Sequence, residues 1–133
     1  MIELLLSNIG HRVVSRVLIP DSQRELTREI KRATKLPKVD SIVVCGGTGI
    51  TRKDVTIEVA ERLLDKQIPG FGEMFRRLSY DEVGSAAILT RALAGVVDGK
   101  VLFCLPGSIN AVRLAISRLI LPEIGHMVKH ASE

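Results

Sequence analysis

The sequence has little aromatic character and no concentrated block of positive charge. Only 3% of its 133 residues are aromatic, with no Trp and a single Tyr, so the stacking platforms on which single-stranded nucleic acids bind are hard to build. Nineteen Lys and Arg exceed fifteen Asp and Glu, but the resulting +4 is scattered along the chain. We therefore expect a protein that attracts small anionic ligands and binds no nucleic acid.

Long apolar runs and a cysteine framework are also missing. No stretch approaches the roughly 18 apolar residues of a membrane span, and the opening Met-Ile-Glu-Leu-Leu-Leu turns polar too early for a signal peptide. The two cysteines, Cys45 and Cys104, each close an apolar run and are expected to be buried, reduced thiols. These features predict a cytoplasmic protein with no membrane partner.

What is present is a regular alternation of strand-like and helix-like segments, expected to form one domain over residues 1–133. Ser22 and Glu25 form a capping-box pattern at the start of a helix with Leu26, Ile30 and Ala33 on its buried face. Asp98-Gly99 predicts a hairpin turn, whereas Pro69-Gly70 and Pro122 are expected to break helices. Helices are predicted over 2–9, 22–36, 56–64, 71–77, 109–119 and about 122–130, helix or turn over 85–91, and strands over 13–19, 41–45, 92–97 and 100–105.

This alternation predicts an α/β fold of three layers. We expect a mostly parallel sheet with helices on both faces and one antiparallel hairpin at an edge.

Residues 45–56, C-G-G-T-G-I-T-R-K-D-V-T, follow an apolar strand and lead into a helix. Glycines let the backbone approach a ligand closely, and a helix start favours phosphate. The segment is therefore either an anion-binding loop or a glycine-rich turn that only reverses the chain.

Three predicted strands end in unusual residues: Ile19-Pro20-Asp21, Cys45 with the glycines after it, and Leu105-Pro106-Gly107-Ser108. Ligands bind at the carboxyl ends of strands in α/β sheets. The convergence of two glycine loops and an acid therefore favours a ligand site.

Familiar nucleotide and metal motifs are absent from this stretch. A dinucleotide fingerprint needs a third glycine where Arg52 stands, and a Walker loop needs Gly-Lys followed by Ser or Thr. His126 and His130 lie four apart, but no Glu follows His126 directly, so they are interpreted as a solvated pair.

Asp21 and Asp54 are the two acids closest to these strand ends. Asp21 is either a turn residue or a site residue, and Asp54 is either an N-cap or a site residue. Beside bound phosphates, two carboxylates could hold Mg²⁺.

Residues in order along nearly the whole chain resemble the MoaB/MogA family of molybdenum cofactor biosynthesis proteins. They are Gly46-Gly47-Thr48-Gly49; Asp54-Val55-Thr56 with Glu58; Pro69-Gly70-Phe71-Gly72-Glu73 with Phe75-Arg76 and Leu78-Ser79; Arg91 with Ala94-Gly95-Val96; and Leu105-Pro106-Gly107-Ser108. Phe71-Gly72-Glu73 and Pro106-Gly107-Ser108 are more similar to the MoaB branch than to the MogA branch.

The resemblance implies a molybdopterin-binding fold, a homo-oligomer (trimer or hexamer) and an enzyme, a molybdopterin adenylyltransferase. The implied reaction is the Mg²⁺-dependent transfer of AMP from ATP to the terminal phosphate of molybdopterin. It releases pyrophosphate and prepares the pterin for insertion of molybdenum or tungsten.

The same resemblance implies roles for individual residues. Asp54 matches the family's essential acid and Asp21 the acid after a strand ending in Ile-Pro-Asp, so both are expected to be catalytic and to hold Mg²⁺. Arg52 and Lys53 are either phosphate contacts or solvated surface. The expected substrate-binding residues are Gly46, Gly47, Thr48, Gly49, Ser79, Pro106, Gly107, Ser108 and Asn110.

Two features depart from the family pattern. Members usually begin with a strand and a Ser-Asp motif upstream of the first helix found here, and many carry Asn where Cys104 precedes Leu-Pro-Gly. A non-catalytic pterin- or nucleotide-binding module, or an assembly scaffold, is therefore the alternative function. A third is the related domain of competence- and damage-inducible proteins.

Overall fold

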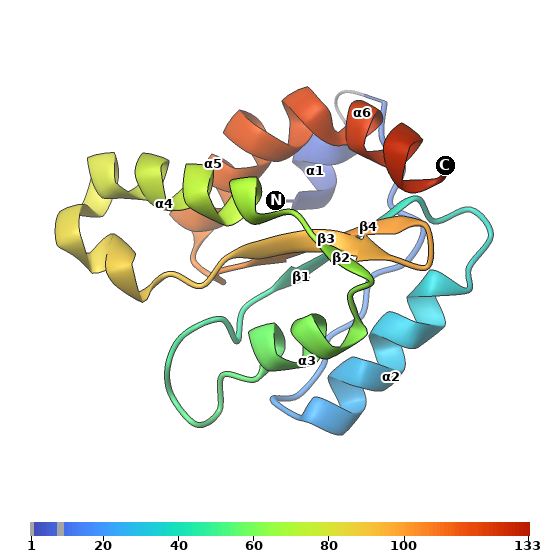
Figure 1. The fold of residues 1–133 in the computed structure, drawn as a ribbon, viewed down its shortest axis with the longest axis horizontal. Coiled ribbons are helices and arrows are strands. Elements are labelled where there is room, and N and C mark those ends of the chain that lie inside the picture. The colour runs from blue at the N-terminus through green and yellow to red at the C-terminus, as the bar shows by residue number, and fades with distance from the viewer. Residues whose placement is uncertain (1, 8–9) are drawn as a thin grey trace.

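A computed structural model describes residues 2–7 and 10–133 of the chain. Its centre is a sheet of β1 (Ser41–Cys45), β2 (Lys66–Gln67), β3 (Leu93–Val97) and β4 (Lys100–Leu105), ordered β1-β4-β3-β2 (Figure 1). The expected α/β architecture is confirmed, with a mixed sheet. The β1–β4 pair is parallel, and the β3–β4 and β2–β3 pairs are antiparallel.

The predicted hairpin joins β3 to β4. Asp98 and Gly99 have φ angles of 51° and 73°, the left-handed values that a two-residue turn between twisted strands requires. The hairpin lies in the middle of the sheet rather than at its edge, because β1 adds to β4 on one side and β2 adds to β3 on the other.

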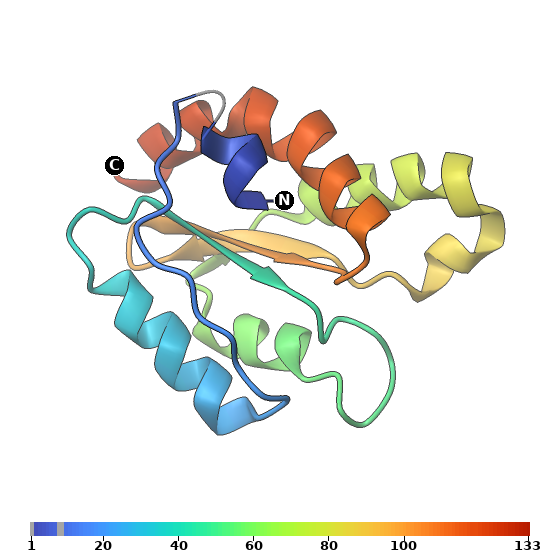
Figure 2. The same ribbon diagram turned by 180° about the vertical axis from the view of Figure 1, so that it is seen from behind.

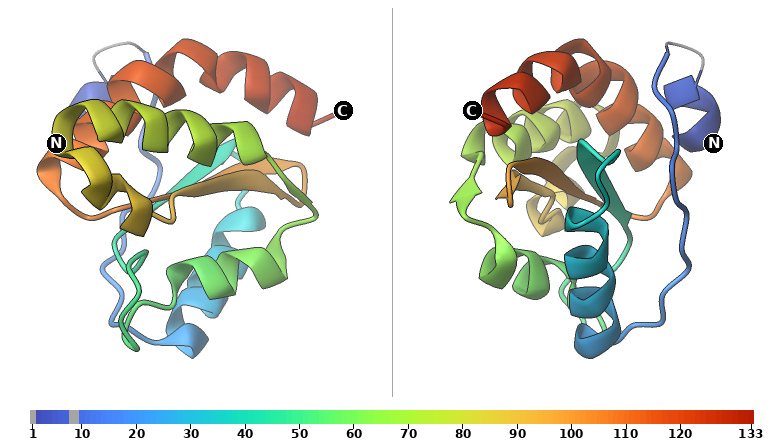
Figure 3. Two further views of the ribbon diagram at one scale, coloured as in Figure 1. Left: turned by 60° about the vertical axis from the view of Figure 1, so that its left-hand side comes forward. Right: turned by 90° about the vertical axis from the view of Figure 1, so that its right-hand side faces the viewer.

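Helices cover both faces of the sheet, as Figures 1 and 3 show. On one face lie α2 (Gln23–Thr34) and α3 (Thr56–Leu63), and on the other lie α1 (Ile2–Ser7), α4 (Pro69–Val83), α5 (Ile109–Ala115) and α6 (Leu121–Ala131). The side chains of β4 alternate between the two cores: Phe103 joins the core under α4 to α6, and Cys104 joins the core over α2 and α3. Both are fully buried, which stabilises a residue such as Phe103 by roughly 1.5–3 kcal/mol.

The strand predicted over residues 13–19 is wrong. Within the described chain this segment is extended but pairs with no strand, and Val14, Val17 and Leu18 are 42%, 46% and 91% exposed. β-Branched composition favours a strand only where a neighbouring strand can complete the ladder. The sheet also has less parallel pairing than expected, because β3 pairs antiparallel with both β4 and β2.

Pro69-Gly70 starts a helix instead of ending one. The preceding helix α3 already ends at Leu63, the short strand β2 follows, and α4 begins at Pro69 and runs to Val83, well past the predicted 71–77. Proline is well tolerated in the first turn of a helix, where its missing N–H has no intrahelical partner to lose. A short helical turn, η1 (Gly84–Leu89), then occupies the segment predicted as helix or turn.

Helix α2 begins as predicted, but only half of the capping box forms. The Ser22 hydroxyl accepts a hydrogen bond from Glu25 N (3.3 Å). The return bond is missing because Ser22 N donates to Pro20 O and the Glu25 carboxylate pairs with Arg28. Leu26 and Ile30 are buried as expected, whereas Ala33 is only partly buried.

The last helical region continues through Pro122. Between α5 and α6 lies a wider π-helical turn, η2 (Ile116–Ile120), in which Leu121 N donates to Ile116 O. A wider turn relieves the clash that proline makes with the preceding carbonyl groups. The predicted second piece is therefore present, but it follows without a break.

The first helix, α1, ends at Ser7, and Ile9 of the predicted helix lies outside the described residues. Gly10, with φ 90°, closes the turn by donating its N–H to Ser7 O. No helix in the part of the chain that the structure describes is long and apolar enough to cross a membrane.

Candidate functional site

The glycine loop, residues 46–55, starts where β1 ends. Gly46 N donates to Leu105 O (2.8 Å), which ties the loop to the neighbouring strand β4. Gly46 and Gly47 have φ angles of 97° and 67°, a region that other residues rarely adopt. Two adjacent left-handed residues explain why the chain needs glycine here, whatever the loop binds.

Thr56, the first residue of α3, closes the loop. Its N–H donates to Gly47 O (3.0 Å) and its hydroxyl to Gly46 O (2.8 Å). The side chain is 4% exposed, and a Cβ atom on Gly47 would overlap its Oγ1. The first N–H of α3 is therefore used to shape the loop, and a phosphate bound here would rely on other donors.

Asp54 does not cap α3. The N-cap is Val55, which makes no side-chain capping bond, so the N-cap interpretation of Asp54 is wrong. Its Oδ2 instead accepts hydrogen bonds from Thr51 N (2.9 Å) and Thr51 Oγ1 (2.8 Å). A Cβ atom on Gly49 would come within 2.6 Å of Oδ2, so glycine is required beside this carboxylate.

The hydrogen bonds from Thr51 lower the pKa of Asp54 below its ordinary value, with smaller contributions in the same direction from Gly49 N and the charge of Arg91. Burial opposes them. A hydrogen bond to the charged form favours that form. Asp54 is thus an ionised, solvent-accessible carboxylate held at a fixed place in the glycine loop.

Arg91, the second residue before β3, fixes the other side of the loop. Its Nε donates to Thr48 O (3.0 Å) and its Nη2 to Gly49 O (2.5 Å). The same guanidinium pairs with Glu58 through Nη1 (2.5 Å) and Nη2 (3.3 Å). The Arg91 bond lowers the pKa of Glu58 and raises that of Arg91. This planar fork joins α3, β3 and the loop in one network.

The second loop, residues 106–108, lies against the first. A Cβ atom on Gly107 would be 3.3 Å from Gly46 Cα, so the two backbones are in contact. Ser108 is the N-cap of α5 and accepts a bond from Ala111 N (3.2 Å), whereas Asn110 is exposed on the first turn of that helix. Parallel pairing of β1 and β4 brings both loops to one end of the sheet, as the sequence predicted.

Asp21 and Ser79 lie on opposite faces of the sheet. Asp21 is exposed in the turn before α2, and Ser79 is partly buried on α4, across the sheet from α2 and α3. Within the described chain, no hydrogen bond joins either residue to the two loops. The structure thus gathers Gly46, Gly47, Thr48, Gly49, Asp54, Pro106, Gly107 and Ser108 at one end of the sheet. The binding and catalytic roles of these residues, and those of Asp21, Ser79 and Asn110, stay predictions.

The two cysteines differ. Cys104 is buried as predicted, but Cys45 is an exposed residue, contrary to expectation. Desolvation nevertheless raises the pKa of Cys45 to about 11 and that of Cys104 to about 12. Both thiols stay protonated at neutral pH, which disfavours a nucleophilic role. Cys104 packs in the core over α2 and α3 and not in the loops.

Three groups that shape the loop received no role from the sequence: the Arg91 guanidinium, the Glu58 carboxylate and the Thr51 hydroxyl. An arginine directly before a buried strand was a usable signal, because loop carbonyls at that end need donors. Thr51 had no comparable signal, since a hydroxyl in a polar loop is ordinary.

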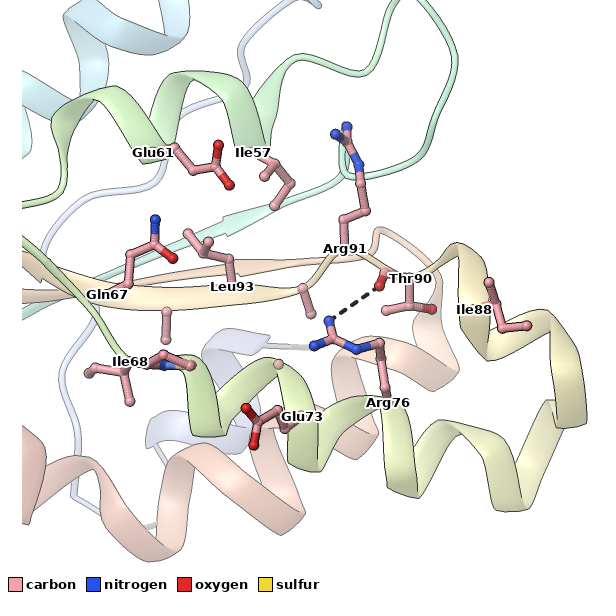
Figure 4. A pocket seen from close by; sticks show the side chains of 14 residues that line it. Ile57, Glu61, Gln67, Ile68, Glu73, Arg76, Ile88, Thr90, Arg91 and Leu93 are labelled. Atoms are coloured by element: carbon pink, nitrogen blue, oxygen red, sulfur yellow. Dashed lines mark hydrogen bonds between the residues drawn. The ribbon is translucent and has the colours of Figure 1, made fainter.

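A cavity of about 460 Å³ lies beside this network, at the outer edge of β3 between α3 and α4. Figure 4 shows Ile57 and Glu61 reaching into it from α3, and Glu73 and Arg76 from α4. Arg76 donates to Thr90 O at 3.4 Å, a weak bond. Of the network's members only Arg91 lines the cavity, so the cavity adjoins the glycine loop without containing the predicted site residues.

The described residues hold no group of three His, Cys, Asp or Glu side chains that could bind a metal. His126 and His130 are exposed on α6, as the solvated-pair interpretation predicted. Mg²⁺, however, commonly binds one or two carboxylates together with substrate phosphates and water. The ionised Asp54 suits that mode of binding.

Comparison with known proteins identifies the same family that the sequence motifs resemble. A sequence profile described as "Probable molybdopterin binding domain" matches residues 1–126. Molybdenum cofactor biosynthesis protein B of Bacillus cereus is 47% identical over 124 residues, which are 92% of this chain and 73% of that protein. Its counterpart in Halalkalibacterium halodurans is 45% identical over 130 residues, or 97% and 76%.

Solved structures of proteins from this family have a fold similar to that of the chain. A crystal structure of molybdenum cofactor biosynthesis protein B has a TM-score of 0.94 at 45% identity, covering 97% of this chain and 81% of that chain. The tungsten cofactor synthesizing protein MoaB from Pyrococcus furiosus has a TM-score of 0.90 at 44% identity, covering 99% and 82%. The protein CinA from Thermoplasma acidophilum, at 18% identity and a TM-score of 0.62, shares the fold alone.

With its two facing loops, its ionised Asp54 and relatives of nearly half identical sequence, this chain belongs to the MoaB/MogA family of molybdenum cofactor biosynthesis proteins, in the MoaB branch.

Proposed function

We propose that the chain is a molybdopterin adenylyltransferase, which uses ATP to adenylylate the terminal phosphate of molybdopterin. A phosphate oxygen of the pterin attacks the α-phosphorus of ATP, the bond to the β-phosphate breaks, and pyrophosphate leaves with its electron pair. The observation that carries the proposal is the fixed, ionised Asp54 within a glycine loop that faces a second loop. The substrates and the metal are part of the proposal.

The loops would hold the reacting phosphates through backbone N–H groups. In the described chain, the N–H groups of Gly47 and Gly107 have no backbone acceptor, so they are candidate donors to an anion. Arg52 and Lys53 are exposed in the same loop and add positive charge. Preorganised donors of this kind offset the repulsion between two phosphate groups without rearranging during the reaction.

Asp54, with Asp21 as the second predicted ligand, would hold Mg²⁺ together with the ATP phosphates. When bound, the metal would neutralise charge on the transferred phosphoryl group and on the leaving pyrophosphate. Thr51 keeps the Asp54 carboxylate ionised and in place, and the Arg91–Glu58 pair keeps the loop around it in one shape.

The test is to incubate the purified protein with molybdopterin, ATP and Mg²⁺ and to follow adenylylated pterin and pyrophosphate by chromatography. We expect equal amounts of both products. Asp54→Ala should still bind the pterin but lose turnover, whereas the exposed Asp40→Ala should leave turnover unchanged. Normal turnover in Asp54→Ala would contradict the metal role, and pterin binding without ATP consumption would favour the alternative of a non-catalytic binding or scaffold protein.

We further propose that the protein forms a homo-oligomer, a trimer or a hexamer. The supporting observation is a projecting arm formed by the end of α4 and by η1 (Figure 1), where Tyr80, Val83, Ile88 and Leu89 are 62%, 57%, 80% and 55% exposed. Apolar residues clustered on a protruding element mark interaction surfaces. Light scattering after size exclusion should give three or six copies, and Ile88→Asp should reduce that number; a wild-type monomer at all concentrations would contradict the proposal.

A further inference from the structure

Helix α6 carries two histidines, His126 and His130, about one turn apart. Figure 2 shows α6 lying over the sheet, with its last turn near the β3–β4 hairpin. A Cβ atom on Gly99 of that hairpin would lie 3.6 Å from Ala131 O, and Ile124 of α6 is buried in the core beneath the helix. These contacts hold α6 on the sheet and so fix where the two histidines lie.

The two imidazole rings face one another through the same nitrogen. His130 Nε2 lies 3.1 Å from His126 Nε2. On the other side of each ring, His126 Nδ1 lies 3.5 Å from Glu123 Oε2, and His130 Nδ1 lies 3.8 Å from Glu133 Oε2. A carboxylate beside Nδ1 favours the tautomer that carries its proton there. Both Nε2 atoms are then acceptors, and their lone pairs repel one another unless a cation lies between them.

The separation of the two nitrogens suits a single metal ion. Bonds from a metal such as Zn²⁺ to imidazole are about 2.0–2.1 Å long. An ion bound equally to two nitrogens 3.1 Å apart would therefore have an N–metal–N angle of roughly 100°. This value lies between the angle of about 90° in square-planar sites and that of about 109° in tetrahedral ones. Because residues four apart share one face of a helix, the backbone of α6 need not move.

The histidine pair lines a second cavity of about 350 Å³, to which β2 and α6 both contribute. The side chains of His126 and His130 are 68% and 63% exposed, so water reaches both rings. Lys66, another lining residue, and Lys129 are exposed as well, and solvent screens their opposing charge. The described residues form no group of three His, Cys, Asp or Glu ligands, so water molecules would complete the coordination.

We propose that His126 and His130 chelate one divalent transition-metal ion through their Nε2 atoms, with water in the remaining coordination positions. Imidazole suits Zn²⁺, Ni²⁺ and Cu²⁺, whereas Mg²⁺ prefers oxygen ligands. The site is therefore different in chemistry from the Mg²⁺ site proposed at Asp54, and α6 lies on the opposite face of the sheet from α3. A bound ion would link two turns of α6 and stabilise the folded chain.

The experiment titrates the whole, untagged chain with NiCl₂ in excess Mg²⁺, using calorimetry for affinity and proton NMR for location. We expect one Ni²⁺ per chain. The paramagnetic ion should broaden the ring signals of His126 and His130 but not those of His11, the third histidine of the sequence. His126→Ala and His130→Ala should each weaken Ni²⁺ binding at least about tenfold, because a single imidazole cannot chelate. His11→Ala, the matched control, should bind Ni²⁺ like wild type.

The effect on stability provides a second measurement. Ni²⁺ should raise the melting temperature of the wild-type chain but not that of His126→Ala or His130→Ala. Both variants should keep the fold, because each replaces an exposed side chain, and circular dichroism checks this. The proposal is overturned if Ni²⁺ does not bind, if only one of the two substitutions weakens binding, or if the signals of all three histidines broaden equally.

Discussion

The glycine loop and the extended segment 11–20 are both irregular, but the loop is held by hydrogen bonds from three sides, whereas most residues of the segment are exposed. The loop bonds to Leu105 on β4, to Thr56 on α3 and to Arg91 before β3. In the extended segment the Ser15 hydroxyl accepts a weak bond from Arg32 at 3.4 Å, and Leu18 is almost completely exposed. The polar partners around the glycine loop therefore fix its irregular backbone in one shape, as a reaction site requires.

The largest effect is expected at Asp54. Asp54→Ala should lower turnover by about 10³-fold, because the carboxylate that would hold Mg²⁺ against the reacting phosphates is lost, while the pterin dissociation constant changes little. Turnover and pterin binding are measured separately, and Asp40→Ala serves as the exposed control. A parallel fall in binding and turnover would mean that Asp54 shapes the site rather than acts in it.

Arg91→Lys comes next. Lysine keeps the charge but cannot bond to Thr48 O, Gly49 O and Glu58 together, so we expect turnover to fall about 10²-fold through misplacement of the loop. The free energy of unfolding should fall by about 2 kcal/mol, measured by urea denaturation. Arg76→Lys, which loses only the 3.4 Å bond to Thr90 O, is the matched control and should change neither value appreciably.

Gly47→Ala tests the loop backbone alone. A residue with φ 67° and no room beside Thr56 Oγ1 should lose about 2 kcal/mol of stability on substitution. Gly125→Ala is the opposite case, because nothing lies within 4 Å of its added Cβ and helix α6 should gain about 0.5–1 kcal/mol. Equal effects of the two substitutions in thermal unfolding would contradict a constrained loop.

Acid should weaken the Arg91–Glu58 pair. The pKa of Glu58 lies below its ordinary 4.5 in the folded protein, because Arg91 bonds to the ionised form. Its contribution to stability is therefore complete above about pH 4.5 and is lost as the pH falls through the folded value. Melting temperatures between pH 7 and pH 3 should fall less steeply in Glu58→Gln than in wild type. Identical slopes would show that Glu58 does not contribute to the pH dependence of stability.

The smallest effect belongs to the extended segment. Val17→Ser should change the free energy of unfolding by less than about 0.5 kcal/mol, as expected for an exposed side chain with few contacts. The measurement is the same urea denaturation. A loss of about 2 kcal/mol, comparable to Gly47→Ala, would show that the segment is held as firmly as the loop.

What could be predicted from the sequence was mostly local. The Asp98-Gly99 hairpin, the Ser22 cap and the strand that feeds the glycine loop each depend on neighbours within a few residues, and all three are confirmed. The 13–19 strand failed because a strand needs a partner that no local pattern supplies. The start of α4 at Pro69 was missed because proline ends or begins a helix according to what precedes it.

For the site as well, local features could be predicted from the sequence and long-range contacts could not. Glycine spacing predicted two loops at one end of the sheet, and Gly107 does lie against Gly46. The Arg91–Glu58 pair joins residues 33 positions apart, and no periodicity or motif length indicates that contact. The interpretation of Asp54 as an N-cap failed because Thr51, three residues earlier, takes its carboxylate instead.

We propose above that the chain transfers AMP from ATP to molybdopterin at the glycine loop around Asp54. Quantifying pyrophosphate and adenylylated pterin formed by the purified chain from ATP, Mg²⁺ and molybdopterin tests it most directly. We predict equal amounts of the two products, both lost in Asp54→Ala while pterin binding persists. Pterin binding by the wild-type chain with no consumption of ATP would contradict it.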